Sequence, residues 1–206
     1  MGSAERRNRE RLELREKILA TAREMFASEG IEAVTMRKIA ERIEYSATAI
    51  YQHFPDKDAL LREICERDFA ALAQQSMRVA REPDPVERVR KLGTAYVEFA
   101  LAHPSSYRLM FMTPKTAGQT STDGQGVPER DAYALLRSVV QECIEQGRLD
   151  KKSWDAELVA QTLWAGVHGL CALEITVACD KWVPWRSIKA RSRHLLDTLL
   201  HGILPR

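Results

Sequence analysis

The short segment 47–53 carries side chains that could read the edges of DNA bases. Ala47 is small enough for a helix start to approach a base pair closely. The Thr48 methyl can contact a thymine methyl, and the Gln52 amide can pair with adenine through two hydrogen bonds. The same spacing suits an ordinary helix with a solvated polar face, so the segment alone leaves both interpretations open.

Side chains that can hold phosphates flank this segment. They are Thr35, Arg37, Tyr51, His53 and Lys57. The free amides at two expected helix starts, after Thr35 and after Pro55, also suit a phosphate group. Such contacts would position a protein on DNA without reading its sequence.

The charge of this region does not decide between the two interpretations. Residues 1–60 contain eleven Lys plus Arg and eleven Asp plus Glu, which gives a balance of zero. Only the leading arm is locally basic, with Arg6, Arg7, Arg9 and Arg11 against Glu5 and Glu10. This arm could reach a neighbouring groove, or it could simply be solvated.

Three short helices must position these side chains, and their apolar spacing predicts them at 12–28, 36–43 and 47–53. The second and third are separated by only three residues, 44–46, so they must cross steeply with a small residue, Ala40, at the crossing. The wedge between the helices would be filled by Ile39, Ile43, Tyr45, Ile50 and Phe54. This is a helix-turn-helix arrangement.

The stretch ILATAREMFASEGIEAVTMRKIAERIEYSATAIYQHFPDKDALL, residues 18–61, resembles the DNA-binding domain of TetR-family (tetracycline-repressor-like) transcriptional regulators. Three motifs carry the resemblance in order: A-x-x-x-F-x-x-x-G, T-x-R-x-I-A and S-x-x-x-I-Y-x-H-F-x-x-K-x-x-L. It implies phosphate contacts from the five flanking residues named above. It also implies base contacts near Ala47, Thr48 and Gln52, on the surface that begins at Ser46.

One turn position departs from the family pattern. The site usually held by Gly is Glu44, followed by the bulky Tyr45. Because Glu tolerates a positive φ poorly, we expect a slightly reshaped turn and an altered orientation of the reading helix.

The rest of the chain is also predicted to be helical, which makes the fold class all-α. Further helices are expected at about 55–81, 86–102, 130–146, 154–178 and 186–203, with a short one near 105–112 and a loop over 113–128. We predict a DNA-binding domain at 12–62 and a ligand-binding and dimerisation bundle at 63–206. A chain of 206 residues with 45% hydrophobic and 29% charged residues supports this globular organisation.

The segment LWAGVHGLCALEI, residues 163–175, resembles a Trp-x-x-x-His-Gly signature of one subgroup of these C-terminal domains. Its residues could line an effector cavity together with aromatic and Met side chains elsewhere in the bundle. The candidate ligand-binding residues are Tyr96, Phe99, Tyr107, Met110, Phe111, Trp164, His168 and Cys171. The alternatives are a plain core stripe and a core histidine satisfied by a neighbouring hydroxyl or carbonyl group. A small, mostly apolar effector is expected, because no Lys or Arg lies in the predicted apolar faces.

Two apolar stripes near the C-terminus suggest a four-helix interface between two copies of the chain. They comprise Val159, Leu163, Val167 and Leu170 on one helix, and Ile188, Leu195, Leu199 and Ile203 on the next. Trp182, Pro184 and Trp185 would lie at the rim. Alternatively, these stripes are buried within one chain.

The sequence carries no recognisable catalytic, cofactor or metal motif. GxGxxG, Walker, GxSxG and HExxH patterns are absent, and the four cysteines are too scattered for a zinc site. We therefore predict a cytoplasmic, homodimeric, ligand-responsive regulator, most simply a repressor, whose partners are operator DNA and a small effector and not a membrane. The alternatives are an activator or architectural DNA-binding protein without an effector, and a helical-bundle enzyme that uses His168 as a base.

Overall fold

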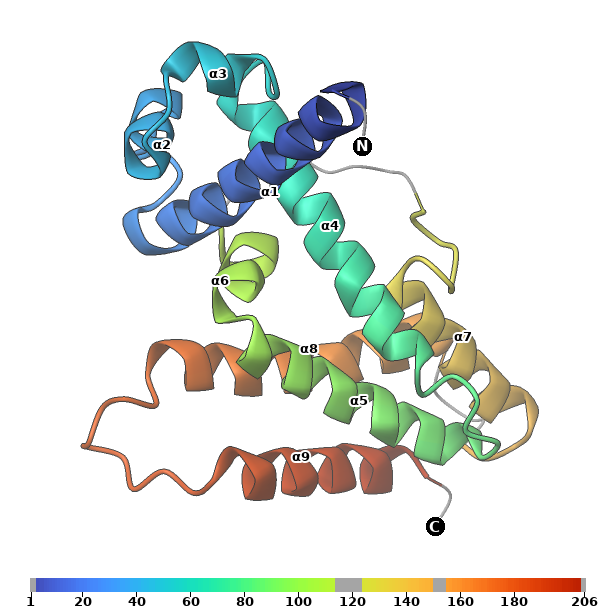
Figure 1. Cartoon of the computed structure of the whole chain (residues 1–206). Helices are drawn as coiled ribbons and strands as arrows, with labels where there is room; N and C mark the ends of the chain where they lie inside the picture. Colours follow the sequence, from blue (N-terminus) through green and yellow to red (C-terminus); the bar gives the residue numbers. More distant parts are fainter. Residues whose placement is uncertain (1–2, 114–123, 150–154, 205–206) are drawn as a thin grey trace. The chain divides into compact units, whose positions relative to one another are not determined.

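The computed structural model describes residues 3–113, 124–149 and 155–204. Within these ranges the chain is helical and contains no strand, as predicted (Figure 1). The chain divides into two compact units. Unit 1 comprises 1–68 with 105–121, and unit 2 comprises 69–104 with 122–206. The predicted boundary lay six residues earlier, at 62/63, and did not anticipate that the segment from 105 onward packs with unit 1.

Unit 1 is built from α1 (Ser3–Glu29), α2 (Met36–Ile43), α3 (Ala47–Tyr51), the first part of α4 (Lys57–Met77), α6 (Pro104–Tyr107) and the π-helical turn η1 (Arg108–Met112). Its core gathers the inward stripe of α1, represented by Ile18 and Phe26, with Ile39 of α2 and Ile50 of α3. Thr35 caps α2, because its Oγ1 accepts a hydrogen bond from the Lys38 amide at 3.2 Å. α1 packs on α2 and on η1, and α2 packs on α3.

The N-terminal arm is part of α1. The sequence predicted a helix from residue 12, but the structure begins it at Ser3. Every residue from Ala4 to Glu13 is exposed, so this segment is helical without packing on the core. Pairs of oppositely charged side chains four residues apart, Arg6–Glu10 and Arg9–Glu13, support a solvated helix of this kind.

Unit 2 contains the end of α4, α5 (Pro85–Ala102), α7 (Ala132–Glu145), α8 (Ala156–Thr176) and α9 (Ile188–Ile203). α5 packs against α7, α8 and α9, and α8 packs against α7 and α9. The core includes Leu92, Val140, Val159, Leu163 and Leu200. Part of the predicted loop 113–128 and the predicted start at Trp154 lie outside the described residues.

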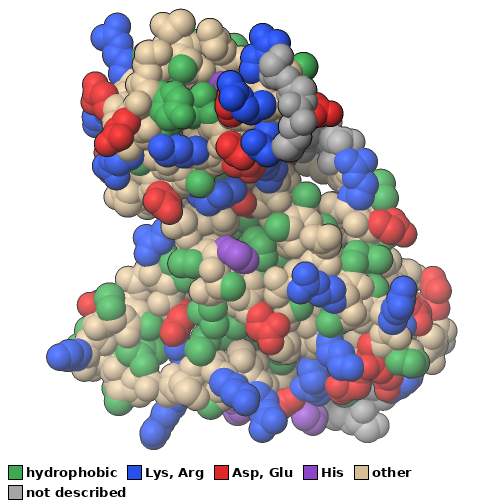
Figure 2. Space-filling view, viewed as in Figure 1, with side chains coloured by type: hydrophobic (Ala, Val, Ile, Leu, Met, Phe, Trp, Pro, Cys, Tyr) green, Lys and Arg blue, Asp and Glu red, His purple; other side chains and the backbone are tan. Residues whose placement is uncertain are grey.

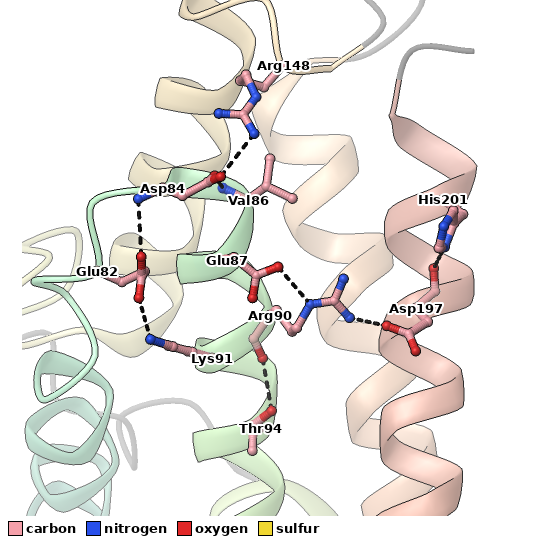
Figure 3. Close-up of polar contacts among 10 residues, drawn as sticks. All are labelled: Glu82, Asp84, Val86, Glu87, Arg90, Lys91, Thr94, Arg148, Asp197 and His201. Carbon is pink, nitrogen blue, oxygen red and sulfur yellow. Dashed lines mark hydrogen bonds and ion pairs between the residues drawn. The ribbon is translucent and has the colours of Figure 1, made fainter.

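A polar network ties the segments of unit 2 together at one end of α5 (Figure 3). Asp84 caps α5 by accepting from the Val86 amide at 2.9 Å, and the same carboxylate pairs with Arg148 after α7 at 3.0 Å. These hydrogen bonds hold the pKa of the half-buried Asp84 carboxyl below its ordinary value. Further along α5, Arg90 pairs with Glu87 at 3.1 Å and with Asp197 of α9. The network therefore fixes α5 against both neighbouring elements.

Candidate DNA-binding surface and effector site

α3 presents its polar side chains to solvent because Ile50, on its opposite side, is buried in the core of unit 1. Ile50 is fully buried, whereas Thr48 and Gln52 are exposed and Ala47 is half-buried. Ser46 is exposed and starts the helix, with its Oγ accepting a hydrogen bond from the Ala49 amide at 3.2 Å. Unit 1 thus carries a short, capped helix whose outer face is exposed to solvent.

The turn between α2 and α3 keeps a standard geometry despite Glu44. This residue adopts the left-handed conformation, with φ 63° and ψ 41°, and it ends α2. The Tyr45 amide donates to the Ala40 carbonyl at 2.9 Å, and the Glu44 amide donates to Glu41 at 3.2 Å. This is the hydrogen bonding of a glycine-type helix end. The expected reshaping is therefore wrong, since Glu44 accepts a strained φ and the turn stays in place.

Tyr45 does not fill the wedge between the helices. Its side chain is 47% exposed and lies beside the Lys17 ammonium, which is 5.4 Å from the ring centroid. The other four predicted wedge residues, Ile39, Ile43, Ile50 and Phe54, are buried as expected. The prediction for Tyr45 failed because the left-handed Glu44 turns the following side chain toward solvent.

The predicted phosphate contacts lie around α3, at the surface of unit 1. Thr35, Arg37 and Tyr51 are exposed, and no ion pair of Arg37 occurs among the described residues. Lys57 is half-buried and donates one hydrogen bond, at 3.0 Å, to the Ile31 carbonyl, which leaves its ammonium two further donors. Basic and acidic side chains are interspersed over this part of the surface (Figure 2), in keeping with the balanced charge of the sequence.

His53 is half-buried at the end of the reading segment. Its backbone carbonyl accepts a hydrogen bond from Arg15 Nη1 at 2.9 Å, and the Arg15 guanidinium lies 4.3 Å from the centre of the Phe54 ring. Burial lowers the pKa of the His53 imidazole, and the charges of Arg11 and Arg15 lower it further. A neutral imidazole would give phosphate a hydrogen bond but no charge. Sequence reasoning missed Arg15, which holds this end of the segment on α1.

Three of the predicted effector residues form one hydrogen-bonded group in unit 2. Trp164 Nε1 donates to the Tyr96 hydroxyl at 3.1 Å, and that hydroxyl lies 3.2 Å from His168 Nδ1. Burial lowers the pKa of the His168 imidazole. A hydroxyl partner for His168 was the alternative anticipated for a core histidine, and this geometry agrees with it. Cys171 and Phe99 are fully or almost fully buried in the same unit.

The other three candidates, Tyr107, Met110 and Phe111, belong to unit 1. Tyr107 and Met110 are buried, and the Tyr107 and Phe111 rings lie 5.1 Å apart. The structure therefore places five of the eight predicted residues in unit 2, where three of them contact one another, and the remaining three on α6 and η1. Helical spacing does not reveal this split, because all eight are simply apolar or aromatic positions.

The predicted dimer stripe on α8 is largely an internal surface, which corrects part of the prediction. Val159, Leu163 and Val167 are at most 4% exposed, and they pack within unit 2. On α9, Leu195 and Leu199 pack on Gly166, where a Cβ would meet Leu199 Cδ1 at 2.7 Å. Leu170, Ile188 and Ile203 are half-buried. For the first three residues the alternative of burial within one chain is the right one.

A different face of α8 is open. Leu158, Thr162, Ala165 and Leu173 are exposed along one side, and nothing lies within 4 Å of the Cβ position of Gly169 on the same side. α8 is also the one described helix that is long and apolar enough to cross a membrane. Its apolarity has a simpler source: one face lines the core of unit 2, and the other carries this stripe of small and apolar residues.

These features define a class of DNA-binding regulators with a helix-turn-helix unit and a separate helical bundle. Similarity to known proteins agrees with this class. Residues 18–64 match the family model described as bacterial regulatory proteins, tetR family, and residues 89–199 match the tetracyclin repressor-like C-terminal domain. The second match alone covers more than half of the chain. The chain therefore belongs to the TetR family of transcriptional regulators, which bind DNA and are not enzymes.

Curated relatives include repressors. The probable acrEF/envCD operon repressor of Escherichia coli is 25% identical over 151 residues, which cover 70% of this chain and 68% of that protein. The transcriptional repressor AcnR of Corynebacterium diphtheriae is 34% identical over 45% of this chain and 43% of its own length. The nucleoid occlusion factor SlmA of Vibrio vulnificus is 33% identical over 47% and 50%. The chain thus spans half or less of the last two relatives.

Solved structures share the whole fold. A protein of unknown function from Rhodococcus sp. RHA1 has a TM-score of 0.73 at 26% identity and covers 93% of this chain and 96% of its own. The ketosteroid transcriptional regulator KstR2 of Mycobacterium tuberculosis has a TM-score of 0.71 at 19% identity, with 93% and 95% coverage. The likeness to KstR2 shows the fold alone.

Proposed function

We propose that this regulator is a cytoplasmic, ligand-responsive repressor that binds a near-palindromic operator as a homodimer. The observation that carries the proposal is the outward face of α3. Thr48 and Gln52 are exposed, the Ser46 cap and buried Ile50 fix the helix, and the half-buried Ala47 leaves its start accessible. A short rigid helix of this kind suits the major groove, where Gln reads adenine and a Thr methyl contacts thymine.

Phosphate contacts would fix the orientation of α3 on the duplex. Thr35 can still donate its hydroxyl proton after capping α2, while Arg37 and Tyr51 are exposed to solvent. Lys57 and His53 complete the set near the start of α4. None of these side chains is needed to fill the core, so their grouping around one helix favours binding over packing.

The homodimer would use the open face of α8. Leu158 and Leu173, 45% and 47% exposed, lie at the ends of a stripe whose middle residues are small. Small residues let a second copy of the helix approach closely, and a two-fold axis would pair the stripe with itself. Trp182, 78% exposed in the connection to α9, suits the rim of this interface. Two reading helices related by the axis require half-sites about 34 Å apart, or a multiple of that spacing.

The effector site would be built around the hydrogen-bonded group of Trp164, Tyr96 and His168. Its indole, phenol and imidazole offer apolar surface with a few polar atoms, which suits a small and mostly apolar molecule. α4 contains residues of both units, so a conformational change in the bundle on effector binding could be transmitted to α3 through this helix. A coupling of about 1–3 kcal/mol would weaken operator binding roughly 5- to 150-fold.

Enrichment of a randomised duplex pool by the protein tests the DNA-binding part of the proposal. We expect one inverted-repeat sequence to be enriched, and a discrete symmetrical footprint on it. Transcription from a promoter that contains this sequence should fall when the protein is added. Long uniform coverage would favour an architectural role, increased transcription would favour an activator, and failure to enrich any sequence would overturn the proposal.

A further inference from the structure

We infer that the exposed N-terminal part of α1 is a second DNA-contacting element, which grips the phosphate backbone beside the site of α3 through Arg7 and Arg11. The inference rests on the proposed operator binding, and it adds a binding surface outside the helix-turn-helix motif. Its partner is the phosphate backbone of duplex DNA, and the contact is independent of base sequence.

The spacing of the arginines carries the first step. Arg7, Arg11 and Arg15 are four residues apart and share one face of α1. Further along the helix, this face becomes the buried stripe that begins at Ile18 and continues through Ala22. A helix that extended only for packing would continue its inner face with apolar residues. Here the inner face becomes basic where the core ends.

The stripe begins directly beside the reading segment. Arg15 donates to the carbonyl of His53 and stacks on the Phe54 ring, and it also pairs with Glu63 of α4. Arg11 is close enough for its charge to act on the His53 imidazole. The arginines therefore continue outward from the C-terminal end of α3, where phosphate contacts of the operator are already expected. Successive arginines are about 6 Å apart along the helix axis, so they can reach different phosphates.

The opposite side of the same segment carries two ion pairs. Arg6 pairs with Glu10 at 3.4 Å, and Arg9 pairs with Glu13 at 3.8 Å. Arg11 has no ion pair among the described residues, and its side chain is exposed. Like charges four residues apart, near the positive end of the helix dipole, destabilise an isolated helix. An anionic partner opposite Arg7 and Arg11 would remove that repulsion.

The helical state of the segment determines how it binds. An α-helix with its side chains is about 10–12 Å wide, whereas the minor groove of B-DNA is only about 6 Å wide. α1 cannot enter that groove as an extended arm would. Its long arginine side chains can reach the phosphates at the groove edge, which gives affinity without base preference.

Two double variants of the full-length protein test the inference. Arg7→Gln with Arg11→Gln removes two charges from the proposed stripe, whereas Arg6→Gln with Arg9→Gln removes the same charge from the opposite side of the helix. Binding is measured by fluorescence anisotropy on the duplex that the wild-type protein enriches from a randomised pool, over a range of salt concentrations. All four positions are exposed, and thermal unfolding monitored by circular dichroism checks that both variants are folded at the temperature of the binding measurement.

For the stripe variant we expect the slope of log affinity against log salt to fall by about 0.9 for each phosphate that is no longer neutralised, or about 1.8 per protomer. Affinity should drop by the same factor on every base substitution of the duplex. The control variant should keep most of the wild-type slope. An equal fall in both variants would show an effect of net charge only, and an unchanged slope in the stripe variant would also overturn the inference. If the wild-type protein enriches no sequence, the proposed function fails first and this inference falls with it.

Discussion

The two units of the protein differ in how far the candidate binding residues also contribute to the stability of the fold. In unit 1 the candidate DNA contacts are exposed or half-buried on helices whose other sides form the core, as with Gln52 and the fully buried Ile50. In unit 2 the candidate effector and dimer residues are buried or half-buried, and some, such as Cys171 and Leu163, belong to the core. A substitution can therefore remove a function of unit 1 without unfolding it, whereas most candidate substitutions in unit 2 affect both.

This difference has a physical origin in what each unit must bind. A groove-reading helix contacts a rigid surface from outside, so its side chains must project into solvent before binding. An effector enclosed in a bundle must be surrounded by the side chains that also pack the bundle. We therefore expect stability and binding to diverge in variants of unit 1 and to change together in variants of unit 2, except on the open face of α8.

The largest effect is expected from two leucines of α8, one buried and one exposed. Leu163 is 4% exposed and Leu173 is 47% exposed. Leu163→Ala leaves a cavity in the core and should lower the free energy of unfolding by about 2–5 kcal/mol. Leu173→Ala should change the stability of the protomer by no more than about 0.5 kcal/mol while weakening the dimer. Urea unfolding measures the first quantity and sedimentation equilibrium the second.

Protein concentration separates the two effects in this pair. The destabilisation in Leu163→Ala should persist at every concentration, whereas any destabilisation in Leu173→Ala should grow as the dimer is diluted. If Leu173→Ala leaves the dimer dissociation constant unchanged, the open face of α8 is not the interface. If Leu163→Ala is as stable as the wild type, the boundary drawn between core and interface is wrong.

A smaller effect is expected from side chains of α3 and its end. Gln52→Ala should cost about 1–3 kcal/mol of discrimination at one base pair and leave the other positions unchanged. Tyr51→Phe should weaken binding to all sequences alike, because a phosphate hydrogen bond carries no base information. Binding to a set of singly substituted operator duplexes measures both.

The stability of these two variants provides the contrast with unit 2. Both side chains are exposed, so the free energy of urea unfolding should stay within about 0.5 kcal/mol of the wild-type value. A uniform decrease of affinity across all base pairs for Gln52→Ala would contradict its role as a base-reading residue. A large decrease of stability in either variant would contradict the separation of function from packing in unit 1.

The pH dependence of stability provides a finer test, because each unit contains one histidine whose pKa is lowered by burial. For His168 burial is the cause, and for His53 the charges of Arg11 and Arg15 add to it. The unfolded chain takes up a proton near pH ~6.5, before either folded imidazole does. The stability that these neutral imidazoles contribute is therefore fully present above that pH and falls as the pH decreases toward the folded pKa values.

Urea unfolding above and below a pH of about 6.5 measures this decrease. His168→Gln and His53→Gln should each flatten the dependence, and His168→Gln should also remove the hydrogen bond to the Tyr96 hydroxyl. An unchanged pH dependence in both variants would show that neither imidazole is kept neutral by the fold. The effect is expected to be smaller than that of Leu163→Ala, since a single protonation equilibrium is involved.

The sequence predicted unit 1 more closely than unit 2, because the determinants of unit 1 are local. α2 was predicted at its observed bounds, Met36–Ile43, with its start directly after Thr35. The four aliphatic and aromatic residues buried behind α3 follow directly from helical spacing. Two predictions in unit 1 were wrong. The start of α1 was placed too late, because the highly charged segment before residue 12 has no apolar periodicity. Tyr45 was predicted to be buried, but the direction of its side chain depends on the turn before it.

In unit 2 the sequence predicted the helices but not the use of their faces. α8 is apolar on nearly every side, so periodicity could not decide which stripe faces α5, which faces α9 and which stays open. Val159, Leu163 and Val167 were assigned to the dimer for this reason. In the same way, Tyr107 was assigned to the bundle, although it belongs to unit 1. Its position in unit 1 is set by tertiary structure, which helical spacing does not reveal.

The smallest effect is expected at Glu44, where the sequence departs from the family pattern but the structure does not. Glu44 has a φ of 63°, a conformation that costs an L residue roughly 1–2 kcal/mol relative to its preferred ones. Glu44→Gly removes that cost but makes the unfolded chain more flexible, so we expect a net stabilisation of about 0.5–1 kcal/mol. Glu44→Ala is the matched control, because it removes the same charge while keeping the strained φ.

Urea unfolding should therefore separate Glu44→Gly from both the wild type and Glu44→Ala. Base preference should be unchanged in both variants, because the hydrogen bonds from the Tyr45 and Glu44 amides already set the turn that orients α3. Stabilisation by both variants alike would assign the effect to the removed carboxylate. A changed base preference in Glu44→Gly alone would show that the strained residue does tilt α3. The orientation of the exposed face in unit 1 would then depend on the backbone of the turn, whereas in unit 2 tertiary packing decides which helix faces are exposed.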